Sequence, residues 1–401
     1  MRTIRDNQKI LLQLIGSALF LYPFTPKSDT DWESVFNESE MQAVSTLAFQ
    51  STVFPLMNEN LAEKIKKRVK THIWSSAKVF KSHAYLHELM CKNDIPYCIV
   101  KGVASAYYYP DPMGRCMGDV DFYVPQEYLS RVEQLLLADG FQRLNINNDH
   151  HITFFKKSVH LELHFEPISL PENELKDIFL EYWQDIYSNA VLRECNSIHF
   201  KMPDEFLHGF ILLTHLQTHL TTSGVGLRHL CDWVTFVHSF SEENFVRIFR
   251  DKLKRVGLWK LAQYLCLAAA DYMGMPYKSW MGDDHETASE LLEDILDGGN
   301  FGRKDKQKEY SGLLVPQSKR KRGRNSRIAQ AFSSLNRIVE FHWKSAKKVP
   351  ILYPIGWIFF TSRFLFRCLI GKRKLMFGKV LSESKKRKDF YEKLGLLIPE
   401  E

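Results

Sequence analysis

The stretch "IVKGVASAYYYPDPMGRCMGDVDFYV", residues 99–124, sets two aspartates inside a run that otherwise has the composition of a buried strand. Aspartate is disfavoured in strand interiors and a carboxylate is costly to bury, so Asp119 and Asp121 need a cationic partner. Because side chains alternate along a strand, both carboxylates are expected on one face at neighbouring positions. Two carboxylates in that arrangement can bind a single divalent metal ion.

A third carboxylate stands in "VHLELHFEP", residues 159–167, where apolar and polar residues alternate as in a half-buried strand. If this strand pairs beside the aspartate strand, Glu162 completes a site of three carboxylates. Hard oxygen ligands of this kind suit Mg²⁺ or Mn²⁺. A zinc set of His160, Glu162 and His164 is an alternative, but it leaves the two aspartates unexplained. We expect His164 instead to orient a carboxylate.

Basic and backbone donors precede the aspartates. Lys101 and Gly102 end one predicted strand just before a helix, whose N-terminal N–H groups can bind an anion that glycine allows to approach closely. Arg115 can donate in a fork to phosphate oxygens. Three carboxylates that hold one or two metals beside a triphosphate are the apparatus of nucleotidyl transfer. We therefore expect Asp119 and Glu162 to act with Asp121 as the catalytic carboxylates, one of which takes the proton of the acceptor hydroxyl.

These two motifs, followed by "GLRHLCDW" at residues 226–233, resemble the uncharacterised bacterial nucleotidyltransferase family of the polymerase-β-like superfamily. The resemblance implies an α+β fold in which a small mixed sheet is flanked by N- and C-terminal helical regions. It also implies metal ligands at the three carboxylates and a nucleotide cleft that Arg228 and Asp232 face. Arg228 and Asp232 lie four positions apart on a predicted helix, where they can alternatively pair with each other.

The sequence departs from the superfamily pattern at one position. The usual Gly-Ser before the aspartate pair, whose serine touches the nucleotide phosphates, is Lys101-Gly102 here. We expect the lysine to substitute for that serine. Further along the chain, His215 and His219 have the spacing of zinc-protease ligands without the catalytic glutamate. We expect these two histidines to be packed helix residues or to line the cleft.

Hydrophobic periodicity divides the 401 residues into five regions. Four consecutive helices are predicted over residues 203–274. The regions are an N-terminal helical region (1–93), a nucleotidyltransferase α/β core (94–200), a helical domain that closes the cleft (201–296), a mobile basic linker (297–327) and a basic C-terminal helical region (328–401).

Composition adds expectations about location and partners. The seven cysteines form no C-x-x-C motif, which favours reduced thiols in a cytoplasm. The formal net charge is +7, and the basic run "SKRKRGR" of the linker is expected to be a solvated tether rather than a nucleic-acid patch. Residues 349–371 contain Arg363 and Arg367, and can lie on an anionic membrane surface or form a core helix.

We expect a metal-dependent enzyme that moves a nucleoside monophosphate from a nucleoside triphosphate to an acceptor hydroxyl or phosphate. A sugar, another small molecule, a protein or an RNA end would all fit as the acceptor. The alternative is a catalytically degenerate nucleotide- or nucleic-acid-binding module of the same fold. Because Asp119 and Asp121 should repel each other without metal, we also expect Asp121→Asn to leave the metal-free protein at least as stable as before.

Overall fold

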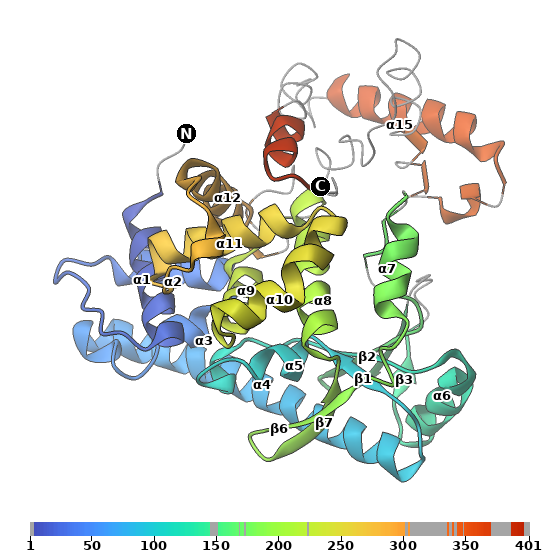
Figure 1. Cartoon of the computed structure of the whole chain (residues 1–401), viewed down its shortest axis with the longest axis horizontal. Coiled ribbons are helices and arrows are strands. Elements are labelled where there is room, and N and C mark those ends of the chain that lie inside the picture. The colour runs from blue at the N-terminus through green and yellow to red at the C-terminus, as the bar shows by residue number, and fades with distance from the viewer. Residues whose placement is uncertain are drawn as a thin grey trace.

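The protein is described by a computed structural model in which a helical layer stands over a small sheet, with one long helix crossing beneath both (Figure 1). The structure describes residues 4–144, 151–167, 169–171, 174–222, 224–300, 304, 335–336, 339–340, 343–347, 349–369 and 386–396.

The five-stranded sheet is mixed, which confirms the predicted α+β class. Its strands in spatial order are β1 (Cys98–Val100), β2 (Val120–Tyr123), β5 (Val159–His164), β4 (His151–Lys156) and β3 (Gln142–Arg143). Only the central pair, β2 and β5, is parallel among the four described pairings, and its register sets Asp121 opposite Glu162. The chain reaches β5 from β2 through α6 (Leu129–Ala138), β3 and β4.

Both faces of the sheet are covered. Val120 and Phe122 of β2 pack in one core with residues of α4 (Glu59–Lys92) and α6. Tyr123 points to the opposite face, into a second core that includes Trp183 of α7 (Lys176–Trp183). This alternation is the one expected of a strand, but the face that carries Asp121 is covered by helices rather than open to solvent. As a result β2 is buried along its whole length.

The helical layer is built from the four helices predicted over residues 203–274 together with helices from other parts of the chain. Those four are α8 (Glu205–Thr221), α9 (Leu227–His238), α10 (Glu242–Arg255) and α11 (Trp259–Met273). Further helices among the described residues are α1 (Asp6–Phe20), α2 (Trp32–Met41), α5 (Gly102–Ala106), α12 (His285–Gly298) and α15 (Leu352–Leu369), and residues 386–393 are also helical.

The first helix belongs to this layer. Its side chains share a core with those of α8, α9 and α11. Gln13 donates to the Tyr272 carbonyl oxygen at 2.7 Å, and the Tyr22 hydroxyl donates to the Met273 carbonyl oxygen at 3.0 Å. A side chain on Gly16 would overlap that same carbonyl, so glycine is required where α1 crosses the end of α11.

Two further segments complete the described chain. A hairpin of β6 (Val191–Cys195) and β7 (Ile198–Met202) packs beside β1 and α4. Of the predicted basic linker at 297–327, only residues 297–300 and 304 are described, so "SKRKRGR" lies outside the described residues. Within the described residues, no helix combines the length and the apolar character needed to cross a membrane.

Candidate active site

Asp121 lies at the centre of the site and is 3% exposed. Lys101 Nζ lies 3.0 Å from Asp121 Oδ2, and His164 Nε2 lies 2.9 Å from Asp121 Oδ1. Burial alone would raise the pKa of Asp121, but the adjacent Lys101 ammonium and the His164 hydrogen bond outweigh it and hold that pKa well below its usual range. Asp121 is therefore a carboxylate at neutral pH, and the prediction that His164 orients a carboxylate is confirmed.

Lys101 has a strained backbone, with φ 57° and ψ −143°. Such a conformation costs a non-glycine residue about 1–3 kcal/mol and persists only where the surrounding structure enforces it. Here the contact with Asp121 holds the ammonium of a side chain that is only 16% exposed. This contact opposes the expectation that Asp121→Asn leaves the metal-free protein at least as stable, because the amide would leave this ammonium without its counter-charge.

Glu162 stands directly beside Asp121 across the parallel strands. Partial burial, together with the charges of Asp121 and Asp119, raises the pKa of Glu162 to about 7. Its Oε2 lies 3.6 Å from His151 Nε2 and 3.7 Å from His164 Nε2. Glu162 is thus a carboxyl group that can gain or lose a proton near neutral pH, which is the property required of a general acid or base.

Asp119 is exposed and comes just before β2, so it is not a strand residue. Its charge contributes to raising the pKa of Glu162, which places it near that carboxyl group. In the described part of the chain, however, the three predicted ligands do not form a set whose ligand atoms all lie within 4.8 Å of one another. Such a set is formed by His151, Glu162 and His164, so His151 takes the place that the zinc alternative gave to His160.

The helix after Lys101 does not provide the anion site that was predicted. Helix α5 has only five residues, and its Val103 N–H donates to His83 Nε2 at 3.4 Å. A Cβ on Gly102 would lie 2.6 Å from the same nitrogen, so glycine makes room for a buried histidine rather than for a phosphate. Burial lowers the pKa of His83 to about 4, and its neutral ring also bonds the Val79 carbonyl oxygen at 2.9 Å.

Arg115 does not have the predicted role either. Its Nε and Nη2 donate to the two carboxylate oxygens of Asp232, both at 2.7 Å, and the Tyr109 hydroxyl donates to Asp232 Oδ1 at 2.7 Å. Arg115 and Asp232 are each 5% exposed. The guanidinium fork, which we expected to bind phosphate, is occupied by the Asp232 carboxylate of α9. The main contact of Asp232 is therefore with Arg115, whereas the sequence suggested a pair with Arg228 on the same helix.

A cavity of about 20 Å³ nevertheless gathers several of the predicted residues at the junction of the sheet and the helical layer. Arg228 is half-buried there, and the charges that act on it include those of Asp232 and Asp119. The lining residues are Lys101, Arg115, Leu212, His215, Arg228, His229 and Asp232. Four of the residues predicted to bind the nucleotide thus line one cavity. Lys101 follows β1, Arg115 lies in the loop before β2, and Arg228 and Asp232 lie on α9.

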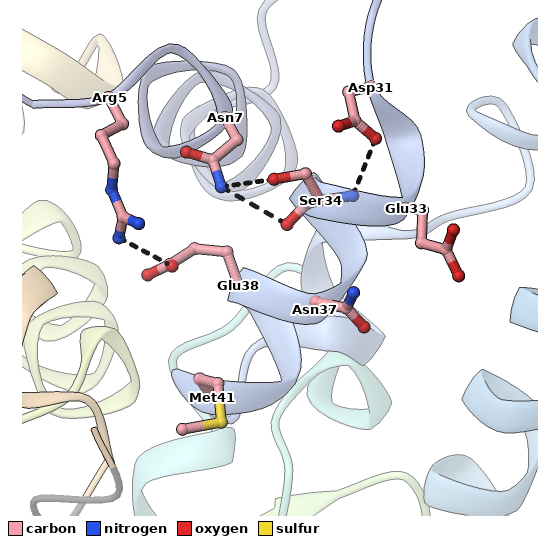
Figure 2. Close-up of a pocket in the computed structure, with 8 residues that line it drawn as sticks. All are labelled: Arg5, Asn7, Asp31, Glu33, Ser34, Asn37, Glu38 and Met41. Carbon is pink, nitrogen blue, oxygen red and sulfur yellow. Dashed lines mark hydrogen bonds and ion pairs between the residues drawn. The ribbon is translucent and has the colours of Figure 1, made fainter.

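A larger depression of about 410 Å³ lies between α1 and α2 (Figure 2). Its side chains bond mainly to one another: Asn7 donates to the Ser34 hydroxyl at 2.8 Å, and Arg5 lies 3.4 Å from Glu38. None of the predicted site residues lines this depression, so the chemistry is expected at the smaller cavity.

The sequence matches the model of a protein family. A model of the family described as "Uncharacterised nucleotidyltransferase" matches residues 28–274. This chain belongs to that family. Its nucleotidyltransferase membership confirms the resemblance seen in the motifs, and the matched range includes the sheet, α8 and α9.

The other comparisons are less informative. No curated protein matches the chain. Among solved structures, the chain is similar to an antigenic nucleotidyltransferase-like protein from Paracoccidioides brasiliensis, with 17% sequence identity and a TM-score of 0.29. The similarity covers 40% of this chain and 75% of that one.

Three residues of the candidate site were not predicted from the sequence. Tyr109 contacts Asp232, 123 residues away, and His83 contacts Val103, 20 residues away. No local pattern indicates either contact. His151 could have been found, because it begins a strand that pairs antiparallel with the "VHLELH" strand and sets it opposite His164.

The buried pair of Arg115 and Asp232 should be necessary for stability. Asp232→Asn leaves the Arg115 charge buried without its counter-charge, so we expect the free energy of unfolding to fall by about 3–5 kcal/mol. Urea unfolding measures the loss. Asp251→Asn is the matched control, because Asp251 is 85% exposed in its pair with Arg250 and should cost less than about 1 kcal/mol. Equal losses in the two variants would contradict the assignment.

Glu162 should make the stability of the metal-free protein depend on pH. Its raised pKa means that the folded protein binds more protons than the unfolded chain between the ordinary glutamate pKa and about 7. Glu162 therefore lowers the free energy of unfolding as pH rises through this window. We expect Glu162→Gln to melt at a higher temperature than wild type at pH 8 in chelator, with a difference that shrinks toward pH 5. A difference independent of pH would show that the pKa of Glu162 is ordinary.

Proposed function

We propose that this protein uses Mg²⁺ or Mn²⁺ to transfer a nucleoside monophosphate from a nucleoside triphosphate to an acceptor hydroxyl or phosphate. The observation that carries the proposal is the parallel pairing that sets Asp121 beside Glu162 and crowds their charges with that of Asp119. Excess negative charge at oxygen donors is what a hard divalent cation relieves. Membership of the nucleotidyltransferase family supports the same chemistry.

The residues divide into two groups by role. Asp119, Asp121 and Glu162 would hold the metal, which in this chemistry stabilises charge on the phosphoryl group and its attacking and leaving oxygens. Lys101 faces both the cavity and Asp121, so its ammonium can move from the carboxylate to a nearby phosphate. Arg228 lines the same cavity and provides a second cation toward the phosphates.

Glu162 is the best candidate for the general base. Without metal its pKa is about 7, and a bound divalent cation would favour the carboxylate form, which is the form that accepts a proton from the acceptor. Arg115 and Asp232 serve a different purpose, since they bond to each other and fix α9 against the loop before β2. The acceptor is a sugar, another small molecule, a protein or an RNA end.

A catalytically degenerate nucleotide- or nucleic-acid-binding module is the second candidate. The observation that favours it is the Lys101–Asp121 ion pair, because an ammonium already offsets the charge that a metal would offset. Replacement of the superfamily's Gly-Ser by Lys101-Gly102 points in the same direction. The two candidates differ in whether nucleotide binding requires metal and in whether any acceptor is labelled.

Calorimetry with Mg²⁺ or Mn²⁺ and each of the four nucleoside triphosphates, followed by labelling of acceptor pools, separates the two candidates. For an enzyme, we expect metal-dependent nucleotide binding, and Glu162→Gln should reduce transfer by roughly 10²–10⁴-fold as expected for loss of a general base. The control is Glu194→Gln, because the Glu194 side chain is 59% exposed on β6. Nucleotide binding without metal and without transfer to any acceptor would favour the degenerate module, and retention of transfer by Glu162→Gln would refute the role of this residue.

We also propose that α15 lies on an anionic membrane surface. Ile351, Ile355, Ile358 and Phe359 have helical spacing, and each is between 45% and 70% exposed. An exposed apolar stripe of this kind marks an interaction surface, and Arg363 is exposed on the same helix. Apolar and basic side chains together match the interior and the head groups of an anionic bilayer.

Co-sedimentation of the full chain with vesicles tests this proposal. We expect binding to vesicles that contain anionic lipid, weaker binding to zwitterionic vesicles, and loss of binding when Ile355 and Ile358 are replaced by serine. Leu192→Ser is the control, because Leu192 is 54% exposed but lies on β6. Equal binding by the double variant and the control would exclude α15 as the contact.

A further inference from the structure

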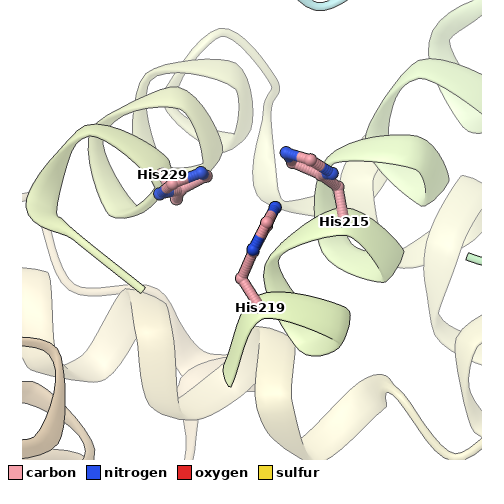
Figure 3. A group of neighbouring side chains, drawn as sticks. All are labelled: His215, His219 and His229. Atoms are coloured by element: carbon pink, nitrogen blue, oxygen red, sulfur yellow. The ribbon is translucent and has the colours of Figure 1, made fainter. Parts of the chain in front are cut away.

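Three histidines from α8 and α9 point toward one another (Figure 3). His215 and His219 lie one turn apart on α8, and His229 lies in the first turn of α9. One ligand nitrogen from each ring can be chosen so that all three lie within 4.8 Å of one another. The ring centroids are 4.4 Å, 5.6 Å and 5.4 Å apart for the pairs 215–219, 215–229 and 219–229.

We propose that His215, His219 and His229 form a binding site for a divalent transition metal of the zinc class, with one coordination position open to the cavity. This site is separate from the carboxylates of β2 and β5, and the proposal does not depend on the transferase activity proposed above.

The donor set determines the class of metal. Imidazole nitrogens suit Zn²⁺, Co²⁺, Ni²⁺ and Cu²⁺, whereas Mg²⁺ prefers oxygen. Three histidines with an open fourth position are a known arrangement for Zn²⁺, with Zn–N distances of about 2.0–2.1 Å and hence nitrogens about 3.4 Å apart. The nitrogens must therefore approach by at most about 1.5 Å from the 4.8 Å limit, a movement that side-chain rotation can supply.

The protonation state is also suitable. Burial lowers the pKa of each of the three histidines, to about 4 for His219, and the charges of Lys101 and Arg228 lower it further in His215. Neutral imidazoles at pH 7 have a lone pair to offer to a metal. His229 Nδ1 accepts a long bond of 3.4 Å from the Gly226 N–H, so coordination through Nε2 requires the other tautomer and gives up this contact.

The open position would face a space that suits a small anionic ligand. His215 and His229 both line the cavity of about 20 Å³, which has room for one water-sized group. Three cationic side chains, those of Lys101, Arg115 and Arg228, line it together with one carboxylate, that of Asp232. Because the cavity is rich in cationic side chains, a hydroxide or an oxyanion is the fourth ligand that this site favours.

Titration of the full chain with Co²⁺, after removal of metals by a chelator, tests the proposal. Visible absorption reports a four-coordinate Co²⁺ with nitrogen ligands, and subsequent addition of Zn²⁺ should displace it. We expect one equivalent to bind, and His219→Ala or His229→Ala to weaken binding by more than about 10–100-fold, the loss that follows even from removing an outer partner of a ligand. The matched control is His238→Ala, at the other end of α9.

Glu162→Gln serves as the second control, because it alters the carboxylate site, keeps the Lys101–Asp121 ion pair and should leave the Co²⁺ spectrum unchanged. Melting curves of each variant in chelator establish that it is folded. Absence of a four-coordinate Co²⁺ spectrum in the wild type would overturn the proposal without reference to any variant. A spectrum that is lost in Glu162→Gln but kept in both histidine variants would also overturn it, since the metal would then lie at the carboxylates.

Discussion

The parallel register of β2 and β5 is the constraint on which the site depends, because it places Asp121 beside Glu162 in the middle of a covered sheet. Two neighbouring carboxyl groups cannot both ionise there at little cost. The Lys101 ammonium contacts one oxygen of Asp121 and His164 contacts the other, and both stabilise the ionised Asp121. The pKa of Glu162 is raised to about 7, so this second carboxyl group stays largely protonated below that pH. Lys101 has a strained backbone in this arrangement, and its ion pair with Asp121 is one of the contacts that offset the cost of that conformation.

A second buried charge pair connects the sheet to the helical layer. Asp232 of α9 accepts from both Arg115 and Tyr109, so the loop that leads into β2 is attached to the helix that lines the cavity. This explains why an arginine that stands close to the aspartate motif in sequence is a positioning residue and not a phosphate ligand. The cations that remain toward the cavity, Lys101 and Arg228, come from opposite sides of the junction between the two layers.

Local sequence patterns predicted much of this architecture, and the rest depended on contacts that no local pattern records. Alternation in "VHLELHFEP" predicted the strand and put Glu162 on its polar face, and helical periodicity predicted α8 to α11. The partner of Arg115 lies 117 residues away, and His229 joins the two histidines of α8 only because α9 packs against that helix. The pairing of Lys101 with Asp121 was hidden for a different reason, since a positive φ at a lysine is not expected from its residue type.

The crossing of α1 over the end of α11 has a consequence for how the chain acquires its structure. Leu11, Leu12 and Ile15 are fully buried in a core that α1 shares with α2 and α3 (Ser45–Ala48), which follow it directly, and with α11, which comes much later in the chain. A side chain on Gly16 would overlap the Met273 carbonyl. During synthesis, which proceeds from the N-terminus, the part of this face that packs on α11 is therefore exposed until the chain up to Met273 has been made. The five strands of the sheet, which include the two that carry Asp121 and Glu162, are all made once residue 164 has been added, because they lie between residues 98 and 164. The sheet core can therefore close before the part of the helical core in which α1 meets α11.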